Sequence, residues 1–352
     1  MIVYPLKFYP LYKEKVWGGS NIQRYFQRNI SEKLPIGESW ELCCHEHGTS
    51  LIKNGKYKNI SITDLINSKG HDILGENHEE YAKSFPLLIK YIDANDKLSV
   101  QVHPNDEYTN YRVGESGKIE MWYIVDAMEN ANIIYGLKED CSKDEFIESV
   151  MNNSIKDNLN YVDIKAGDVL YIPAGTVHAI CEGTLIAEIQ QNSDTTYRLY
   201  DWDRVGLDGK PRQLHITDAV SVIDHGVKNN KAQGYTFSNK DYDKTVYVSC
   251  DKFTVEKINV KRKYVDNLNG KIFKIYMCLD GDLDIIHNNK IEFLKAGETI
   301  LIPASLENYR IIGNGTLIKT YIQEPMEVAK RLNSMGATRE DLLKIEGLNR
   351  II

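Results

Sequence analysis

The sequence predicts a mainly β protein built from two β-barrels, with helical insertions and a short helical tail. Three observations lead to this prediction. Short apolar segments rich in β-branched and aromatic residues are bounded by Gly, Pro and Asn, as strands usually are. One such segment occurs twice, together with its turn. The length of 352 residues exceeds what one small core needs and suffices for two domains.

The repeat relates residues 165–174 to residues 295–304. The sequence Lys-Ala-Gly-Asp-Val-Leu-Tyr-Ile-Pro-Ala recurs as Lys-Ala-Gly-Glu-Thr-Ile-Leu-Ile-Pro-Ala. Further along, Gly-Thr-Leu-Ile at residues 183–186 recurs at residues 315–318. Two matches in the same order indicate two copies of one barrel design.

The repeat divides the chain into three expected parts. Residues 1–235 are expected to form the first barrel with helical insertions, residues 236–323 the second barrel, and residues 324–352 a helical extension. Asn308 stands five residues after its proline, where the first copy has His178. We therefore expect the chemistry in the first barrel and a degenerate, structural second barrel.

The N-terminal part begins with strands and a helix. Residues 4–19 predict an opening strand that ends at a Gly turn, and residues 38–47 predict another strand. Residues 61–84 are predicted to be helical, because Ser61 fits an N-cap with Asp64 at the capping-box position. No common zinc-finger spacing fits the nearby Cys43, Cys44, His45 and His47.

Three apolar strands are predicted next, at residues 85–94, 98–104 and 120–126. Lys90 is the odd member of the first of them. A second helix is predicted over residues 142–159, where Ser142 provides the cap and Glu follows three residues later.

The remaining segments connect and extend the barrels. Residues 206–245 are rich in Gly, Asn, Asp and Lys, which predicts a linker. After Pro325 the pattern becomes helical and is interrupted at Gly336, which predicts two short appended helices.

Composition limits the classes of partner. With 42% apolar and 26% charged residues, the chain is typical of a soluble globular protein. Its net charge of −7 favours neither nucleic acid nor an anionic membrane, so a phosphorylated substrate needs local basic residues. No apolar run approaches the ~20 residues of a membrane span. The N-terminal residues do not resemble a signal peptide, and the six scattered cysteines predict free thiols in the cytoplasm.

The segment Gly167–His178 carries the most specific pattern in the chain. Residues 168–172 are apolar and predict a buried strand, and Pro173-Ala174-Gly175 predicts a turn. His178 then lies on the returning strand. The pattern G-x5-P-x-G-x2-H resembles the second metal-binding motif of the cupin barrels, which have a jelly-roll topology. A lone histidine in a strand is usually a core residue, but this fixed spacing favours a ligand.

Other potential ligands lie on neighbouring predicted strands. Gln101 and His103 are two residues apart in a strand, so their side chains leave the same face. With Glu120 and His178 they make a nitrogen and oxygen donor set without thiolate, which suits zinc and equally iron, manganese or cobalt. The alternatives are an ion pair of Glu120 with Lys118 and a core hydrogen bond for Gln101.

These motifs, taken together, resemble the type I mannose-6-phosphate isomerases (phosphomannose isomerases) of the short bacterial kind, a family of the cupin superfamily. The resemblance covers residues from about 10 to 215 in family order and is weaker in the second barrel. The matching stretches are residues 16–19, 37–40, 85–90, 101–104, 117–123, 173–179 and 190–198.

The resemblance implies an activity and a cofactor. The activity is the interconversion of mannose 6-phosphate and fructose 6-phosphate through a cis-enediol, a reaction of mannose metabolism. One zinc ion per chain is implied at His103, Glu120 and His178, with Gln101 as the fourth ligand. The active-site arginine of the family falls on Arg198.

The chemistry of isomerisation assigns further roles. Arg198 is charged and forked, so it can stabilise a developing oxyanion. Lys118 shares a strand face with Glu120 and is the first candidate for proton transfer, because a nearby dication favours the neutral amine. Lys90 is the second candidate, as base or phosphate contact, and Ser99 can also serve the phosphate. The alternatives are a solvated charge for Lys118, a snorkelling side chain for Lys90 and a surface ion pair of Arg198 with Asp201 or Asp203.

Two other functions remain possible at this point. A different cupin enzyme, such as an iron oxygenase, can use the same two histidines and one glutamate. A non-catalytic cupin can bind sugar, although it needs no complete open ligand set. The expected partner is a phosphorylated hexose, with no nucleic acid and no membrane, and the expected state is a monomer or a weak homodimer.

Overall fold

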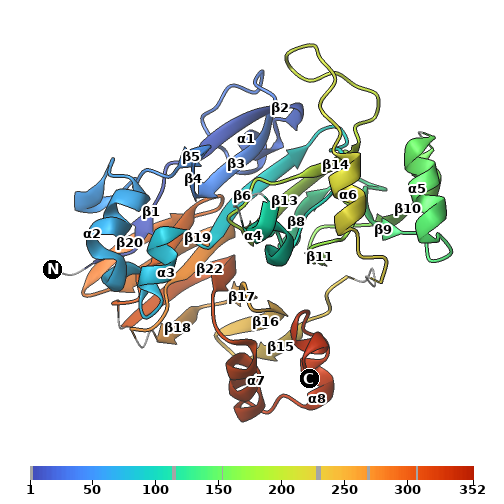
Figure 1. Ribbon diagram of the computed structural model, residues 1–352. Helices are drawn as coiled ribbons and strands as arrows, with labels where there is room; N and C mark the ends of the chain where they lie inside the picture. The colour runs from blue at the N-terminus through green and yellow to red at the C-terminus, as the bar shows by residue number, and fades with distance from the viewer. Residues whose placement is uncertain (1–2, 113–115, 153, 227–230, 268–269, 307) are drawn as a thin grey trace. The chain divides into compact units, whose positions relative to one another are not determined.

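The computed structural model describes residues 3–112, 116–152, 154–226, 231–267, 270–306 and 308–352 (Figure 1). The chain is mainly β, which confirms the predicted fold class. No helix in these residues is long and apolar enough to cross a membrane.

The chain forms two compact units, which differ from the expected division. The central unit comprises Tyr12–Trp40 and Leu88–Lys231. The terminal unit comprises the residues up to Leu11, with Glu41–Leu87 and Ala232–Ile352. Residues 41–87, expected in the first barrel, therefore pack with the C-terminal part of the chain.

Two sheets make the central unit. The larger has the strand order β11-β8-β13-β6-β3-β2, and the smaller has the order β10-β9-β12-β7-β14. Their bounds are β2 Leu11–Gly19, β3 Ile36–Leu42, β6 Leu87–Ala94, β7 Val100–Val102, β8 Glu120–Ala127, β9 Asn132–Leu137, β10 Leu159–Asp163, β11 Val169–Ile172, β12 His178–Ile180, β13 Thr184–Gln191 and β14 Tyr197–Tyr200.

One apolar core joins the two sheets of the central unit. Trp122 and Leu170 of the larger sheet belong to the same buried cluster as Ile133 and Ile180 of the smaller sheet. Alternate residues of each strand face this core, as the period of two in a strand requires. The two sheets therefore enclose a packed apolar interior. Polar side chains on the inward faces of the strands lie at one end of this interior.

Helices cover the other face of the smaller sheet. Phe146 of α5 and Ala219 of α6 share a buried cluster with Val100 and Val102 of β7, and Figure 1 shows α6 beside β14. The cap of α5 is as predicted, because Ser142 and Glu145 form a capping box. The helices and 3-10 turns of this unit are α1 Asn21–Tyr25, α4 Asp106–Arg112, α5 Lys143–Met151, η2 Ile155–Asn158 and α6 Ile216–Val222.

The prediction of a linker over residues 206–245 is only partly correct. The helix α6 lies within it, and two strands of the terminal unit begin before its end. Because the segment is polar overall, its composition did not indicate that one side of α6 is apolar. Ala219 on that side is fully buried. This helix packs on β14, so the segment is a structural part of the central unit.

The terminal unit is organised around a nine-stranded sheet. Its main order is β1-β21-β19-β22-β17-β16-β15, with β18 beside β22 and β20 beside β19. The bounds are β1 Leu6–Lys7, β15 Tyr235–Ser238, β16 Tyr242–Ser249, β17 Thr254–Val260, β18 Lys263–Asn267, β19 Lys274–His287, β20 Lys290–Lys295, β21 Thr299–Ile302 and β22 Asn308–Tyr321. Between β1 and β15 in the chain, this unit also has a small hairpin of β4 Cys44–His45 and β5 Gly48–Thr49 and the turn η1 Gly55–Tyr57.

The predicted helical segment at residues 61–84 forms two helices of this unit, α2 (Ile62–Leu74) and α3 (His78–Lys83). Ser61 caps α2 as predicted, because its side chain accepts a hydrogen bond from the Asp64 backbone. The backbone N–H of Ala304 donates to the carbonyl of Ile73 over 2.9 Å. These contacts to the turn after β21 explain why the segment packs with residues distant in sequence.

The predicted tail helices are present as α7 (Pro325–Ser334) and α8 (Arg339–Leu342), followed by η3 (Leu348–Arg350). Val328 and Leu332 of α7 and Ile345 after α8 are buried against Val246 and Tyr321. In Figure 1 both helices lie beside β15 to β17. The extension is thus a packed part of the terminal unit.

The turn between β11 and β12 depends on a glycine. Gly175 has φ of +86°, which L side chains rarely adopt. A Cβ atom there would lie 2.9 Å from the carbonyl oxygen of Val222. The N–H of Gly175 also donates to the carbonyl of His103 over 2.9 Å. The turn therefore fixes the backbone that precedes His178.

We expect Gly175→Ala to destabilise the protein by about 1–3 kcal/mol, because the new side chain is both strained and crowded. Urea unfolding measures the change. Gly167→Ala is the matched control, since Gly167 has φ of +92° and no atom lies within 4 Å of the place that its Cβ would take. Equal losses in the two variants would show that crowding at the turn is unimportant.

Candidate metal centre

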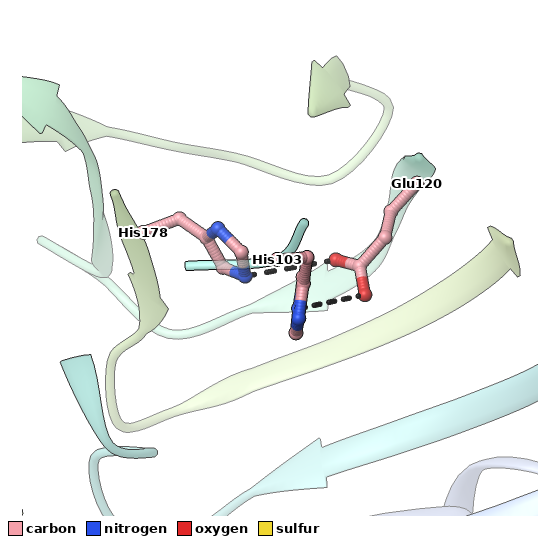
Figure 2. Close-up of side chains that lie close together, drawn as sticks. All are labelled: His103, Glu120 and His178. Atoms are coloured by element: carbon pink, nitrogen blue, oxygen red, sulfur yellow. Dashed lines mark ion pairs between the residues drawn. The ribbon is translucent and has the colours of Figure 1, made fainter. Parts of the chain in front are cut away.

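Three strands bring the predicted donors together. His103 follows β7, Glu120 begins β8 and His178 begins β12. Strands β7 and β12 are paired, with Gln101 opposite His178. Figure 2 shows both imidazoles directed at the carboxylate of Glu120. All three are buried, and their potential ligand atoms lie within 4.8 Å of one another.

The contacts are centred on the carboxylate. The Nε2 atom of His103 lies 3.2 Å from Oε1 of Glu120, and Nε2 of His178 lies 3.7 Å from Oε2. Trp122 donates its indole N–H to Oε2 over 3.1 Å. Oε1 also lies 2.8 Å from the Lys118 ammonium, so both oxygens of this buried carboxylate face nitrogen atoms.

Both imidazoles are held in the tautomer that a metal needs. Nδ1 of His103 is 2.9 Å from the carbonyl oxygen of Thr195, and Nδ1 of His178 is 2.9 Å from that of Thr176. A carbonyl oxygen only accepts, so each Nδ1 carries the hydrogen. Each Nε2 then presents a lone pair toward Glu120, and the carbonyl fixes the ring orientation.

The charges of the centre also suit a cation. Burial, together with the nearby Lys118 ammonium, lowers the pKa of His103 to about 3. Burial likewise lowers the pKa of His178. For Glu120, burial alone raises the pKa, but Lys118 and His103 outweigh it and hold the pKa well below its usual value. At neutral pH the site therefore offers two neutral imidazoles and one carboxylate, the forms that bind metal.

Gln101 lies where a fourth ligand is expected. Its amide Nε2 is 3.3 Å from Nε2 of His178, and its Oε1 accepts from the Ser99 hydroxyl over 3.4 Å. Rotation of the amide by half a turn presents oxygen to the centre instead, because the two amide atoms are nearly equivalent in shape. The residues present thus fit a divalent ion with nitrogen and oxygen ligands.

Lys118 is part of the same cluster. Its ammonium lies 2.8 Å from Oε1 of Glu120 and 3.3 Å from Nε2 of His103. The ion pair with Glu120, considered above as an alternative to metal binding, is therefore present. It does not replace the metal interpretation, because the two histidines converge on the same carboxylate.

A cavity of about 270 Å³ opens beside the centre. Six of the eight predicted site residues line its wall: Lys90, Ser99, Gln101, Lys118, Glu120 and Arg198. The other two, His103 and His178, contact Glu120. Lys90 is buried and pairs with Glu188 over 2.7 Å. Burial lowers the pKa of Lys90, which makes this amine a stronger candidate base than its sequence position indicated.

Arg198 is placed for a ligand in this cavity. One of its terminal nitrogens donates to the carbonyl of Gln213 over 2.8 Å. Its Nε is buried without a partner among the residues that the structure describes. Asp201, one of the two alternative partners, instead accepts from Arg204 and Arg212, and Asp203, the other, accepts from the Tyr200 hydroxyl. Among the residues that the structure describes, Arg198 therefore forms neither of the two alternative ion pairs.

Five charged residues of the cavity wall were not predicted as site residues from the sequence; they are Lys15, Glu38, Glu188, Asp194 and Arg212. Arg212 lies in the segment predicted to be a linker, where nothing marks it. Glu188, like Lys90, is a charged residue within an otherwise apolar strand. This unusual position was the sequence signal that could have identified it as a site residue. In the described residues, Cys43 to His47 provide no comparable group of metal ligands.

Comparisons with known proteins agree with this geometry. Residues 6–139 match the family model described as phosphomannose isomerase type I, catalytic domain. Residues 243–322 match the model described as mannose-6-phosphate isomerase, cupin domain. The first match ends before the predicted linker at residues 206–245, and the second begins within its last three residues.

Whole-chain relatives carry the same description. A mannose-6-phosphate isomerase of Bacillus subtilis is 35% identical over 323 residues, covering 92% of this chain and 100% of that protein. One from Streptococcus mutans is 35% identical over 311 residues, covering 88% and 96%. The crystal structure of a Bacillus subtilis mannose 6-phosphate isomerase superposes with a TM-score of 0.84 and 34% identity, over 91% of this chain and 100% of that one.

Proposed function

The chain belongs to the type I phosphomannose isomerase family and interconverts mannose 6-phosphate and fructose 6-phosphate, and we propose that His103, Glu120 and His178 hold the divalent ion of this reaction, with Gln101 as a fourth ligand. The convergence of two correctly oriented imidazoles on one buried carboxylate carries the proposal. Zinc is the proposed ion, one per chain, because these donors and this number of ligands suit it.

A bound divalent ion supplies a Lewis acid that polarises the sugar carbonyl. The residues around it then arrange the transfer of a proton. In the forward direction the proton leaves C2, its electron pair forms the C1–C2 double bond, and the carbonyl pair moves to O1, which takes up a proton to give the cis-enediol. The O2 hydroxyl then loses its proton and becomes the ketone carbonyl, while the double-bond pair takes a proton at C1. The reverse steps convert fructose 6-phosphate to mannose 6-phosphate.

Lys118 is the proposed carrier of that proton. Its ammonium is within 3.3 Å of both Glu120 and His103, so the side chain ends at the reacting centre. Lys90 is the second candidate, because its pKa is lowered by burial. The ion pair of Lys90 with Glu188 favours a role in substrate contact, since the ammonium is already engaged.

Arg198 is proposed to stabilise negative charge on the substrate. Its unpartnered Nε supplies a donor for a developing oxyanion or for the phosphate. Ser99 and Arg212 supply further donors on the cavity wall. The cavity wall carries five basic side chains and four carboxylates, so positive charge is in slight excess there although the whole chain has a net charge of −7; the basic residues are Lys15, Lys90, Lys118, Arg198 and Arg212, and the acidic ones are Glu38, Glu120, Glu188 and Asp194.

Removal of the metal tests the proposal. We expect the isomerase activity, measured as fructose 6-phosphate formed from mannose 6-phosphate in a coupled assay, to be lost after dialysis against a chelator. Adding Zn²⁺ should restore it, because an apo site of this donor set rebinds its ion. Elemental analysis should show about one ion per chain in the untreated protein and in the protein restored with Zn²⁺. Full activity in metal-free protein would refute the proposal.

Three further expectations remain proposals. The central unit is proposed to be catalytic and the terminal unit structural, because the metal centre and its cavity lie wholly in the central unit. A cytoplasmic location is supported by the six cysteines, which form no disulfide among the residues that the structure describes. The monomer or weak homodimer stays a prediction.

A further inference from the structure

Strands β16, β17, β18, β19 and β22 of the terminal unit and its helix α7 carry a group of charged side chains that lie close together. The group contains four basic side chains and two carboxylates, and we call it the terminal-unit cluster; its members are Lys244, Lys274, Lys319, Arg331, Glu256 and Asp266. Glu256 is fully buried, and the three lysines are 8% exposed or less. Buried charge on this scale requires an explanation, because desolvation is costly.

The repeat places this cluster at the counterpart of the metal centre. In the central unit, Ile172 of the repeated segment pairs with Glu120. In the terminal unit, Ile302 occupies the same place in the segment and pairs with Lys274. A lysine thus stands where the first copy has its carboxylate ligand.

The neighbouring strand shows the same replacement of a negative side chain by a positive one. In the central unit, Trp122 stands two residues after Glu120 and pairs with Glu188. In the terminal unit, Tyr276 stands two residues after Lys274 and pairs with Lys319. Two positions that carry negative charge in one unit therefore carry positive charge in the other.

The two carboxylates of the cluster are already fully engaged. Asp266 lies 2.8 Å from the Lys274 ammonium and 2.6 Å from that of Lys319. It also accepts from the hydroxyls of Tyr264, Tyr276 and Tyr309. Glu256 lies 3.1 Å from Lys319 and 3.0 Å from Arg331, and it accepts from the hydroxyl of Tyr321.

Lys244 is left without an acceptor. Its side chain is only 9% exposed, and its ammonium lies 4.0 Å from Glu256, beyond hydrogen-bond distance. It makes no hydrogen bond to the residues that the structure describes. The pKa of Lys244 is lowered, chiefly by burial, with contributions from Lys319 and Arg331. The Nε atom of Arg331 is also buried without a partner in the described chain.

The positive charge of the cluster is therefore in excess. Four basic groups face two carboxylates, which leaves a charge of +2 when all are ionised. Burial and the nearby Lys319 lower the pKa of Lys274 to about 8, as expected where positive charges crowd together. The side chains of Asp266 and Arg331 are 15% and 35% exposed, so solvent reaches the cluster.

We propose that the terminal-unit cluster binds a small oxyanion, with the Lys244 ammonium as its principal contact. The central unit presents neutral imidazoles and a carboxylate to a cation, and the terminal unit presents lysines at the matching strand positions. An anion with two or more oxygens supplies the acceptors that Lys244 lacks. Phosphate, sulfate and carboxylate share this chemistry.

Thermal unfolding of the full-length protein in sodium sulfate tests the proposal. A ligand that binds only the folded state raises the unfolding temperature, by about 4 °C at ten times its dissociation constant for a unit of this size. We expect this rise in the unaltered protein and a smaller rise in Lys244→Met. The control is Lys290→Met, which removes an exposed lysine of β20 and should behave as the unaltered protein does. Equal rises in all three proteins would overturn the proposal.

Two additions separate the possible outcomes. Sodium acetate at the same ionic strength tests whether a carboxylate replaces sulfate, and sodium chloride shows the effect of salt alone. Crystals grown with selenate should show an anomalous selenium peak beside Lys244, placed so that a selenate oxygen lies within hydrogen-bond distance of Nζ. This measurement does not depend on the folding of any variant. No peak there, or a peak only in the cavity of the central unit, would overturn the proposal.

Discussion

His178→Ala is expected to abolish both metal binding and isomerisation. The variant removes one of the two imidazoles that converge on Glu120, 3.7 Å from its carboxylate. Metal content should fall from about one ion per chain to near zero, and kcat/KM should fall at least about 10³-fold, because a Lewis acid contributes several kcal/mol to the transition state. Elemental analysis and the coupled assay measure the two losses.

The repeat supplies a matched control for this variant. Asn308 occupies the place of His178 in the second copy and is exposed at the start of β22. Asn308→Ala should leave metal content and turnover unchanged. A loss of activity in folded Asn308→Ala, with His178→Ala still active, would mean that the chemistry belongs to the terminal unit.

Lys118→Met is expected to lower kcat by about 10²–10⁴-fold while the metal remains bound, because the variant removes the proposed proton carrier and leaves the ligands in place. Turnover in D₂O distinguishes this role from a structural one. The unaltered enzyme should incorporate deuterium from the solvent at the substrate carbon that exchanges its proton. Lys118→Met should lose this incorporation together with turnover.

Lys90→Met separates the two lysine candidates. Lys90 is buried like Lys118, but it pairs with Glu188 rather than with a metal ligand. We expect this variant mainly to raise KM, with isotope exchange retained. If Lys90→Met instead loses exchange while Lys118→Met keeps it, the assignment of the proton carrier is reversed.

The sequence allowed the prediction of those parts of the site whose spacing is local. The turn before His178 has a fixed pattern of Gly and Pro, and Gln101 and His103 share a face by strand geometry alone. The structure brings them together as expected. Arg212 was missed because it belongs to a polar segment whose path depends on packing of α6 against β14.

Local sequence patterns also could not predict the boundaries of the two units. Nothing in residues 61–84 indicates that they pack on the turn after β21, which is more than 200 residues later. The inverted charges in the second copy were hidden for a different reason. Glu120 and Ile172 are 52 residues apart, whereas the paired Lys274 and Ile302 are only 28 apart. An insertion of this size breaks the alignment of the two copies, and only strand pairing restores it.

The discontinuous terminal unit has a consequence for the growing chain on the ribosome. Every segment of the central unit has been synthesised once Lys231 has left the ribosome. Strand β1 and the helices α2 and α3, although made first, must wait for β19 and β21. The apolar faces of the early helices are thus uncovered during synthesis of nearly two hundred further residues. Shielding by a chaperone is most valuable in that interval, since exposed apolar surface promotes aggregation.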